Sequence, residues 1–426
     1  MILLYRIITT LLYPLLVIFI YFRKIIKKEN PSRFKEKIYP SHFNIEDKKM
    51  NKLIWFHATS IGELKSIVPI LKELNSAETK LKFLITTTTL SSSEIAKIEL
   101  KKIPNACHRF FPLDVNFLVQ QFLKKWKPNV IFFVDSEIWP NLIFSAKKFG
   151  IPIVLINARI TSKTSKRWMW FPGVAKKIFN CFNLCLASNL ETKNFLKNLN
   201  VENVQFYGNI KLANKINVSA IQNQNKNILV NKRFWFAAST HIGEDEFCLK
   251  THLLLKKKYP DIISIIAPRH IERSKDIKSL SENLNLKTQI LHKGERIEED
   301  KEIIIINVFG ILQDYFKYTK SVFMGKSIPK KLKKVGGQNP IDAAKLGCKI
   351  YHGPYVYNFE EVYKILEKNN ISSMIQSPEE LSDNLSKDLN DIQKKSSEIS
   401  DLINSLGEKT LIDTMKEIKK FINEIK

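Results

Sequence analysis

The chain has 426 residues, and its 68 Lys and Arg against 42 Asp and Glu give a formal net charge of +26. Hydrophobic residues make up 44% and charged residues 26%, which excludes a wholly disordered chain and a polytopic membrane protein. The length predicts two or three domains. The charge indicates an anionic partner, such as nucleic acid, an acidic membrane surface or a phosphorylated substrate, although many of the lysines are ordinary solvated surface. Five cysteines without metal-ligand spacing favour a reducing compartment.

The first predicted element is a membrane anchor. Residues 2–22 are almost entirely apolar, and about 20 such residues span a hydrocarbon core of ~30 Å as one helix. Four basic residues follow within 23–28, which places the rest of the chain on the cytoplasmic side. No signal-peptide cleavage site is evident. We expect residues 1–28 to form a single N-terminal transmembrane anchor; a buried helix and a shallow helix in the interface are the alternatives.

Beyond residue 50 the chain alternates short β-branched or aromatic runs with helical stretches, a pattern typical of βαβ units and parallel sheets. The helices are expected at 63–74, 115–126 and 142–149. Strands are predicted at 53–57, 82–87, 130–134, 152–157 and 184–187, and in a second series at 233–237, 262–267, 288–291, 302–306, 321–324 and 349–351.

The order of these elements predicts an α/β protein with two Rossmann-like domains facing a cleft. The polar, Asn-rich stretch 213–232 is interpreted as a linker between a first domain at 29–212 and a second at 233–405. The amphipathic end of the chain, 406–426, is expected to form a helix that packs back on the first domain.

Ligands of open parallel sheets bind at the carboxyl ends of the strands, so the residues just after strands are the candidates for function. Glu63 follows the first strand behind Gly62, where it is either a helix-start acid that complements the dipole or a general base. Glu137 follows a later strand and is expected either to stabilise positive charge in a transition state or to raise the pKa of Glu63 if the two are close. Arg159 and Lys211 are cations available for a phosphate or carboxylate.

In the second domain, Ser239 and Thr240 follow a strand, and Pro268 and Arg269 follow the next one. The sole Gly-Gly pair, at 336–337, precedes a predicted helix start, where backbone N–H groups are expected to approach an anion. The sequence has no GxxxxGK[ST], GxGxxG, HEXXH or CxxC motif, which argues against an NTPase, a dinucleotide oxidoreductase and a protein-bound catalytic metal.

Taken in order, these segments resemble the 3-deoxy-D-manno-octulosonic acid (Kdo) transferases. The resemblance runs from the N-terminus to about residue 365, and it rests on HATSIGEL, ITTTTLSS, DSEIWPN, INARI, GNIKL, AASTHIGE, APRHIER and GGQNPIDAAKLG. It implies the GT-B fold and transfer of Kdo from CMP-Kdo to a lipid A precursor at the cytoplasmic face of the inner membrane. By this resemblance Glu63 is the general base, and Glu137 and Lys211 stabilise the transition state.

The resemblance also implies which residues contact CMP. These are Pro268, Arg269, Phe309, Gly310, Ile311, Asn339, Pro340, Ile341 and Asp342. The chain departs from the family where Asp135, Gln338 and Asp342 replace Glu, His and Glu, and where Ile311 replaces a loop carboxylate. Asp342 keeps a carboxylate that is shorter by one methylene. The catalytic side is therefore better preserved than the nucleotide side.

The implied reaction is a single inverting displacement at the anomeric carbon of Kdo, with Glu63 accepting the proton of the attacking hydroxyl. The expected partners are CMP-Kdo as co-substrate, the tetraacylated lipid A precursor and anionic inner-membrane lipids, without a cofactor and without nucleic acid. One alternative is another GT-B membrane-associated glycosyltransferase that uses a different nucleotide sugar. The non-enzyme alternative is a membrane-tethered binder of anionic polymer, for which basic residues interleaved with aromatics on one face are expected.

Overall fold

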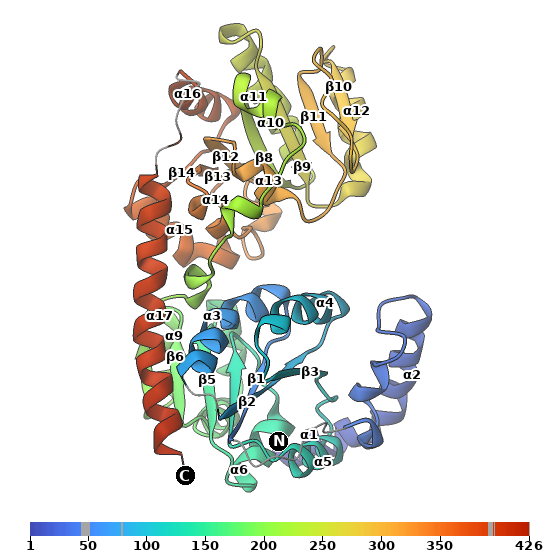
Figure 1. Ribbon diagram of the computed structural model, residues 1–426, viewed down its shortest axis with the longest axis vertical. Helices are drawn as coiled ribbons and strands as arrows, with labels where there is room; N and C mark the ends of the chain where they lie inside the picture. Colours follow the sequence, from blue (N-terminus) through green and yellow to red (C-terminus); the bar gives the residue numbers. More distant parts are fainter. Residues whose placement is uncertain (44–51, 78–79, 391–394, 396, 426) are drawn as a thin grey trace. The chain divides into compact units, whose positions relative to one another are not determined.

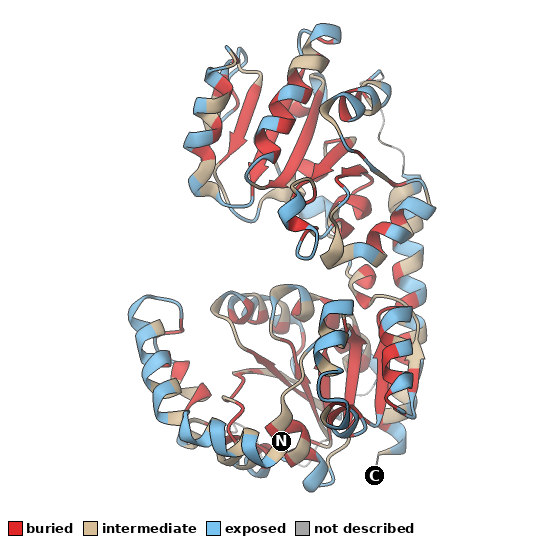
Figure 2. Ribbon diagram, turned by 180° about the vertical axis from the view of Figure 1, so that it is seen from behind, coloured by how far each residue is buried: buried red, intermediate tan, exposed pale blue. Residues whose placement is uncertain are grey.

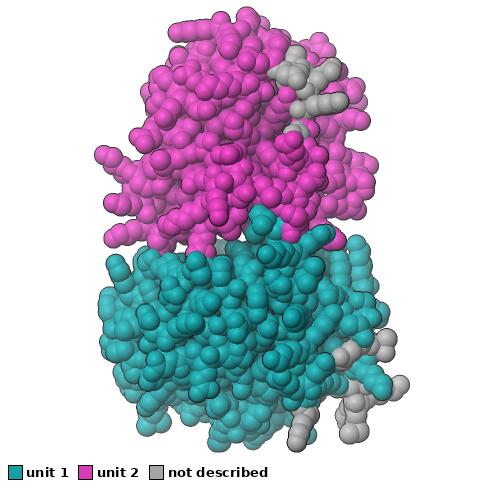
Figure 3. Space-filling view, turned by 90° about the vertical axis from the view of Figure 1, so that its left-hand side faces the viewer, with its two compact units in different colours: residues 1–214, 406–426 teal, residues 215–405 magenta. Residues whose placement is uncertain are grey.

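The computed structural model describes residues 1–43, 52–77, 80–390, 395 and 397–425 (Figure 1). The chain divides into two compact units, which Figure 3 colours separately. Unit 1 comprises Met1–Asn214 together with Leu406–Lys426, and unit 2 comprises Lys215–Ser405. The end of the chain therefore returns to the unit in which the chain begins.

Unit 1 is built on a seven-stranded sheet in which every pair of neighbours is parallel. The strand order is β3-β2-β1-β4-β5-β6-β7. Successive strands are added on one side of β1 up to β3 and on its other side from β4 onward, so the topological switch point lies between β1 and β4, and such sheets bind ligands at that point. The strands are β1 (Lys52–His57), β2 (Leu81–Thr87), β3 (Ala106–Phe110), β4 (Val130–Val134), β5 (Ile153–Ala158), β6 (Leu184–Ala187) and β7 (Val204–Phe206).

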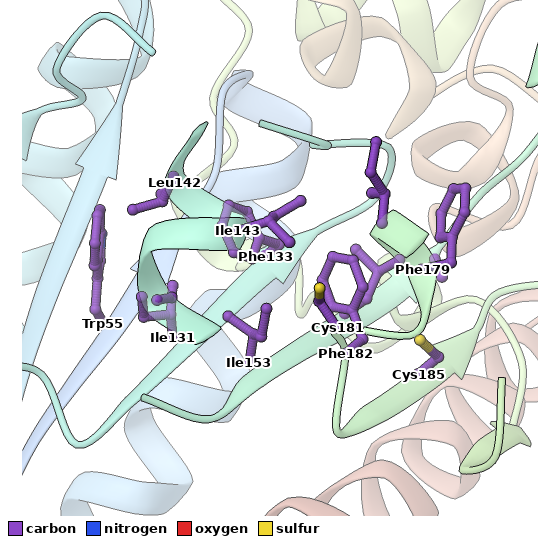
Figure 4. Close-up of a cluster of buried hydrophobic side chains, with 14 of the residues drawn as sticks. Trp55, Ile131, Phe133, Leu142, Ile143, Ile153, Phe179, Cys181, Phe182 and Cys185 are labelled. Atoms are coloured by element: carbon purple, nitrogen blue, oxygen red, sulfur yellow. The ribbon is translucent and has the colours of Figure 1, made fainter. Parts of the chain in front are cut away.

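Helices cover both faces of this sheet, because the side chains of its strands are apolar on both sides. Ile54 and Phe56 point into one core and Trp55 into the other, which contains the side chains of Figure 4. The helices after β1 are α3 (Ile61–Ala77), α4 (Leu90–Glu99), α5 (Asn116–Trp126), α6 (Pro140–Lys148), α7 (Ser162–Trp168), α8 (Pro172–Phe179) and α9 (Leu190–Asn198). The 3-10 turns η1 (Phe34–Lys37) and η2 (Pro40–His42) precede β1, and η3 (Leu100–Lys102) and η4 (Ile210–Ala213) follow it.

The long helix α17 (Glu398–Glu424) begins before the predicted residue 406, and its second half packs on unit 1. Met415, Ile418 and Ile422 are buried in the same core as Ile54. The Tyr207 hydroxyl donates to Glu417 Oε1 at 3.1 Å, and Lys52 Nζ donates to the carbonyls of Ile422 and Ile425 at 2.7 Å each. These contacts tie the C-terminus to the first strand of the sheet.

Unit 2 repeats the architecture with a second parallel seven-stranded sheet, in the order β10-β11-β9-β8-β12-β13-β14. Its strands are β8 (Phe234–Thr240), β9 (Ile263–Pro268), β10 (Thr288–Leu291), β11 (Ile303–Ile306), β12 (Ser321–Met324), β13 (Lys349–His352) and β14 (Ser372–Met374). Its helices are α10 (Lys226–Asn231), α11 (Glu244–Lys258), α12 (Ser274–Glu282), α13 (Leu312–Phe316), α14 (Ile341–Lys345), α15 (Glu360–Lys368) and α16 (Pro378–Asp388), with 3-10 turns η5 (Val218–Ala220), η6 (Ile271–Arg273), η7 (Lys330–Leu332) and η8 (Tyr357–Phe359).

Three strands were not predicted from the sequence: β3, β7 and β14. All three lie at sheet edges and are short or polar, so they lack the continuous apolar run of a central strand. The predicted linker at 213–232 is also more structured than expected. It contains η5 and α10, and unit 2 already begins at Lys215.

The N-terminal segment forms two helices, α1 (Ile2–Leu11) and α2 (Tyr13–Ile25), instead of the single helix predicted over 2–22. Pro14 lies at the start of α2 and lacks the N–H that a continuous helix would need there. No single helix among the described residues is long and apolar enough to cross a bilayer; α1 and α2 reach the length and apolar composition of a span only when taken as a pair, which is bent by 54°. The prediction of one transmembrane helix is therefore not supported.

Candidate active site

The strongest candidate site of unit 1 lies at the carboxyl ends of β1 and β4. These strands are parallel neighbours, with His57 opposite Phe133, so the loops that follow them are adjacent. The loop after β1 carries Thr59 and Ser60 before α3, and the loop after β4 contains Asp135–Trp139 before α6. The predicted residues Glu63 and Glu137 are thereby brought to one edge of the sheet, at its switch point.

Glu63 forms a capping box with Ser60 at the start of α3. Its Oε2 accepts hydrogen bonds from the backbone N–H groups of Thr59 at 2.7 Å and Ser60 at 3.3 Å, and its Oε1 accepts one from Ser60 Oγ at 2.8 Å. In return, the N–H of Glu63 donates to Ser60 Oγ at 3.2 Å. The helix-start role considered from the sequence is therefore present in the structure.

The same carboxyl also has the electrostatics of a base. Burial raises the pKa of Glu63, and the nearby carboxylates of Glu137 and Asp135 raise it further, against the lowering effect of the hydrogen bonds from Ser60 and Thr59. A carboxylate with a raised pKa accepts a proton more readily than an ordinary surface Glu. The two roles are compatible, because the capping bonds hold the carboxylate in place.

Glu137 is in a different environment. Trp139 Nε1 donates to Glu137 Oε2 at 2.8 Å, and His57 Nε2 lies 3.6 Å from the same oxygen. Burial on its own would raise the pKa of Glu137, but the interactions with His57, Thr59 and Trp139 together outweigh it and lower the pKa below its usual value. The two carboxyl groups are thus pushed apart in pKa, so that Glu137 stays ionised while Glu63 is the better proton acceptor.

Lys211 is held by a partner that the sequence alone did not identify. Its Nζ forms an ion pair with Asp135, a residue that is 5% exposed and adopts a left-handed backbone with φ of 65°. Asn157, with φ of 53°, accepts the N–H of Ile210 on its Oδ1 at 3.0 Å and so positions the turn that carries Lys211. Arg159, half-buried, is anchored through its N–H to the carbonyl of Asp135 at 3.2 Å.

In unit 2 the loop after β8 repeats the Ile-Gly-Glu sequence of the loop after β1. Here the acid, Glu244, is fully buried and accepts four backbone N–H groups, from His241, Lys326, Ser327 and Ile328, at 2.6 to 3.0 Å. It therefore fastens the loop after β12 to the start of α11. This role is structural, which separates Glu244 from Glu63 despite the shared motif.

Ser239 and Thr240, at the end of β8, are enclosed by neighbouring backbone and side chains. Ser239 has φ of 58°, and Thr240 Oγ1 donates to Asp245 Oδ1 at 2.7 Å. Asp245 also forms an ion pair with Arg273. A Cβ on Gly325 would lie 2.6 Å from the Ser239 carbonyl oxygen, so only glycine fits there. The side chain of Thr240 is buried and already engaged, so it is not available to a ligand.

The glycine pair does not form the expected anion site at a helix start. The N–H of Gly336 donates to the Leu332 carbonyl at 2.6 Å, and that of Gly337 donates to the Lys326 carbonyl at 2.7 Å. The helix that follows, α14, has only five residues, and Pro340 is its N-cap instead of lying in its first turn. The glycines serve close packing, since a Cβ on Gly336 would lie 2.1 Å from the Tyr355 carbonyl oxygen.

The remaining predicted CMP contacts lie after β9, after β11 and around α14. Arg269 directly follows Pro268 and is exposed, Phe309 is 59% exposed, and Gly310 has φ of 83°. Ile311 caps α13 and lines a recess of about 230 Å³ that also contains Asn223 and Tyr315. Further along the chain, Asn339 Oδ1 accepts the N–H of Ile341 at 3.1 Å, and Gln313 donates to Asp342 Oδ2 at 2.9 Å.

Among the described residues, no group of three or more His, Cys, Asp or Glu side chains is placed to hold a metal ion.

The sequence did not identify His57 and Trp139 as partners of Glu137. Both belong to motifs that it did single out. Trp139 lies in the same loop as Glu137, whereas the contact of His57 depends on the pairing of β1 with β4 and on the loop after β4.

Comparison with known proteins gives a consistent result. Residues 32–214 match the family model described as 3-Deoxy-D-manno-octulosonic-acid transferase (kdotransferase). A protein of Arabidopsis thaliana named "Probable 3-deoxy-D-manno-octulosonic acid transferase, mitochondrial" is 30% identical over 384 residues, which are 88% of this chain and 84% of that protein. The 3-deoxy-D-manno-octulosonic acid transferase of Rickettsia bellii is 29% identical, over 89% of this chain and 88% of the relative.

Solved structures share the fold at much lower identity. UDP-GlcNAc 2-epimerase from Neisseria meningitidis, bound to UDP-GlcNAc, has a TM-score of 0.57 at 12% identity, and the match covers 87% of this chain and 100% of the epimerase chain. A putative UDP-N-acetylglucosamine 2-epimerase from Listeria monocytogenes has a TM-score of 0.59 at 10% identity, over 88% of this chain and 98% of its own. With its two parallel seven-stranded sheets, the chain has the GT-B fold predicted from the sequence.

Proposed function

Since the chain belongs to the Kdo transferase family and is a Kdo glycosyltransferase, we propose that it moves Kdo from CMP-Kdo to the tetraacylated lipid A precursor of lipopolysaccharide. We propose further that the transfer inverts the anomeric centre. The observation that carries this proposal is the pair of carboxyl groups at the switch point of the unit 1 sheet, with the pKa of Glu63 raised and that of Glu137 lowered.

In the proposed reaction the acceptor's primary sugar hydroxyl attacks the anomeric carbon of Kdo. The new carbon–oxygen bond forms as the bond to the phosphate oxygen of CMP breaks, and the hydroxyl proton passes to the Glu63 carboxylate. The capping bonds from Thr59 and Ser60 keep that carboxylate in a fixed orientation. Most of the rate acceleration then comes from positioning and from charge stabilisation.

Glu137 and Lys211 are the proposed stabilisers of the transition state. Glu137 remains ionised beside His57 and Trp139, so it offers a negative charge to the positive charge that develops at the anomeric carbon. Lys211 is kept in a defined position by Asp135 and is suited to the carboxylate of Kdo or to a phosphate. Arg159 is a second candidate for the same anion.

For the donor, unit 2 offers the segments after β9 and β11. The exposed Arg269 is suited to the phosphate of CMP, and the exposed ring of Phe309 beside Gly310 is suited to its base. Asp342 is the proposed contact of the ribose, with Gln313 as its present partner. We propose that CMP-Kdo is a co-substrate and that the protein uses no cofactor of its own.

We also propose that the protein works at the cytoplasmic face of the inner membrane, with anionic lipids as partners. The apolar N-terminal segment with basic residues at its end supports this location, which also suits the proposed lipid acceptor.

Incubation of the purified protein with CMP-Kdo and the tetraacylated precursor tests the function. The product mass should increase by one or more Kdo residues, and NMR of the product should show inversion at the anomeric carbon. Parallel reactions with UDP-sugars test the alternative glycosyltransferase. Turnover of a UDP-sugar without turnover of CMP-Kdo would refute the proposed donor.

A further inference from the structure

The surface formed by α1, α2 and the α7–α8 connection is unusually apolar for an exposed region. The side chains of Leu3, Leu11, Ile18 and Ile25 are 64 to 76% exposed along the two helices. Figure 2 shows the helix pair as mostly exposed. Exposed apolar surface on this scale marks an interaction site. Contacts with the body of unit 1 fix the orientation of α1 and α2.

A row of polar groups fixes the inner side of these helices against the body of unit 1. The Tyr5 hydroxyl donates to Asp114 Oδ2 at 2.9 Å, and the Tyr13 hydroxyl donates to the Ile38 carbonyl at 2.6 Å. Thr9 Oγ1 accepts a hydrogen bond from Asn141 Nδ2 at 3.1 Å. Ile20 is buried with Phe34 and Ile38 in a small core of its own. These contacts leave the apolar residues at 3, 7, 11, 15, 18, 22 and 25 facing outward.

A second apolar element lies beside the start of α1. Met169, Trp170 and Phe171, between α7 and α8, are 51%, 73% and 52% exposed. Trp170 and Phe171 line a recess of about 480 Å³ together with Met1 and Ile2. The helix pair and this loop, residues 1–25 and 169–171, therefore form one docking surface within unit 1, although about 140 residues of chain separate them.

The charges around the docking surface indicate its partner. Residues 1–28 contain no Asp or Glu, and neither do residues 138–190, so both segments carry only basic charge. Exposed Lys24 lies in the last turn of α2, exposed Lys27 and Lys28 follow the helix, and exposed lysines flank the 169–171 loop on α7 and α8. A second copy of the chain would bring like charge to this surface. An anionic lipid headgroup layer is complementary to it.

We propose that the docking surface lies in the plane of an anionic phospholipid leaflet, with α1, α2 and the 169–171 loop inserted at the boundary between the headgroups and the acyl chains. The helices are then interfacial elements held to the protein by Tyr5, Thr9 and Tyr13 instead of a span that leaves it. This inference rests on the membrane location proposed above and names the surface responsible. Transfer to detergent-dispersed acceptor does not depend on it, so its failure and that of the proposed function are distinguishable.

The test is flotation of the full-length protein with vesicles of phosphatidylcholine and phosphatidylglycerol, without acceptor. The double variant Trp170→Ser/Phe171→Ser should partition at least about tenfold more weakly, because it removes two large apolar side chains from the interface. Ile412→Ser, which changes a side chain that is 66% exposed on α17, is the matched control and should bind like the wild type. Equal binding of all three proteins would overturn the proposal.

Two further measurements fix the orientation. Brominated lipids should quench a fluorescence component that Trp170→Phe lacks, and protease added outside the vesicles should remove an N-terminal tag completely. A protected tag would show that α1 and α2 cross the bilayer and would overturn the in-plane arrangement. Binding that appears only when lipid A precursor is added, or lipid-free self-association that is lost in the double variant, would identify a different occupant and refute the proposal as well.

Discussion

Glu63→Gln is the substitution that separates a catalytic base from a helix cap. Glutamine keeps the length of the side chain and one acceptor oxygen for the N–H of Thr59, but it cannot take a proton at neutral pH. If Glu63 is the general base, the transfer rate should fall by ~10²–10⁴-fold. Binding of CMP-Kdo should be unchanged, because no donor contact is proposed for this residue.

The expected change in stability follows from two opposing contributions. Weakening the capping box costs on the order of 0.5–2 kcal/mol. Against this, the folded protein disfavours the ionised form of Glu63, which is why its pKa is raised by burial, by Glu137 and by Asp135. Removing that charge offsets the capping loss at neutral pH. The free energy of unfolding should therefore change little while the rate collapses.

Ser60→Ala is the matched control. It removes the hydroxyl that bonds both the N–H and the carboxylate of Glu63, so it should cost about 1 kcal/mol of stability while leaving the carboxylate to accept a proton. Initial rates and urea denaturation are measured on the same preparations of the wild type and both variants. Retained turnover in Glu63→Gln with lowered stability would refute the assignment of Glu63 as the base.

The remaining predictions concern pH, the donor and metal ions. The transfer rate should fall with decreasing pH, because Glu63 reacts in its deprotonated form; since its pKa is raised, the apparent pKa of this fall should lie above the usual Glu value of about 4.3. A pH–rate profile measures this, and the profile of Glu63→Gln should lack the fall at low pH. Burial raises the pKa of Asp114 from 3.8 to about 6, so the folded state binds a proton that the unfolded state has lost, and the free energy of unfolding should decrease by about 2 kcal/mol as pH rises from 4 to 7. Asp114→Asn should reduce this pH dependence in a denaturation series, and an unchanged pH dependence would contradict the raised pKa of Asp114. Arg269→Ala should raise the KM for CMP-Kdo by about 10- to 150-fold, the equivalent of ~1.5–3 kcal/mol for a charge-assisted phosphate contact, and an unaltered KM would place the nucleotide elsewhere. Transfer should continue after treatment with a chelator, and loss of activity that Mg²⁺ restores would refute the expectation that no metal is used.

The sequence by itself determined much of the fold and the identity of the proposed base. Central strands such as β4 and β6 were predicted to the residue, because strands buried on both faces need an unbroken apolar run. Glu63 was singled out because it follows a strand end and a glycine, and both features are local. The motifs around it also carried the resemblance to the Kdo transferases, which the comparison with relatives bears out.

Only the tertiary structure decided which partners these residues have. Asp135 holds Lys211, and His57 lies against Glu137, across 76 and 80 positions of chain, and such pairs depend on strand register and loop conformation instead of local pattern. The N–H groups of Gly336 and Gly337 were expected to approach an anion, but the fold uses them for bonds to Leu332 and Lys326. Three of the four edge strands, β3, β7 and β14, and the orientation of α1 and α2 likewise depend on neighbours distant in sequence, because hydrogen-bond partners and burial are set by the groups packed against them.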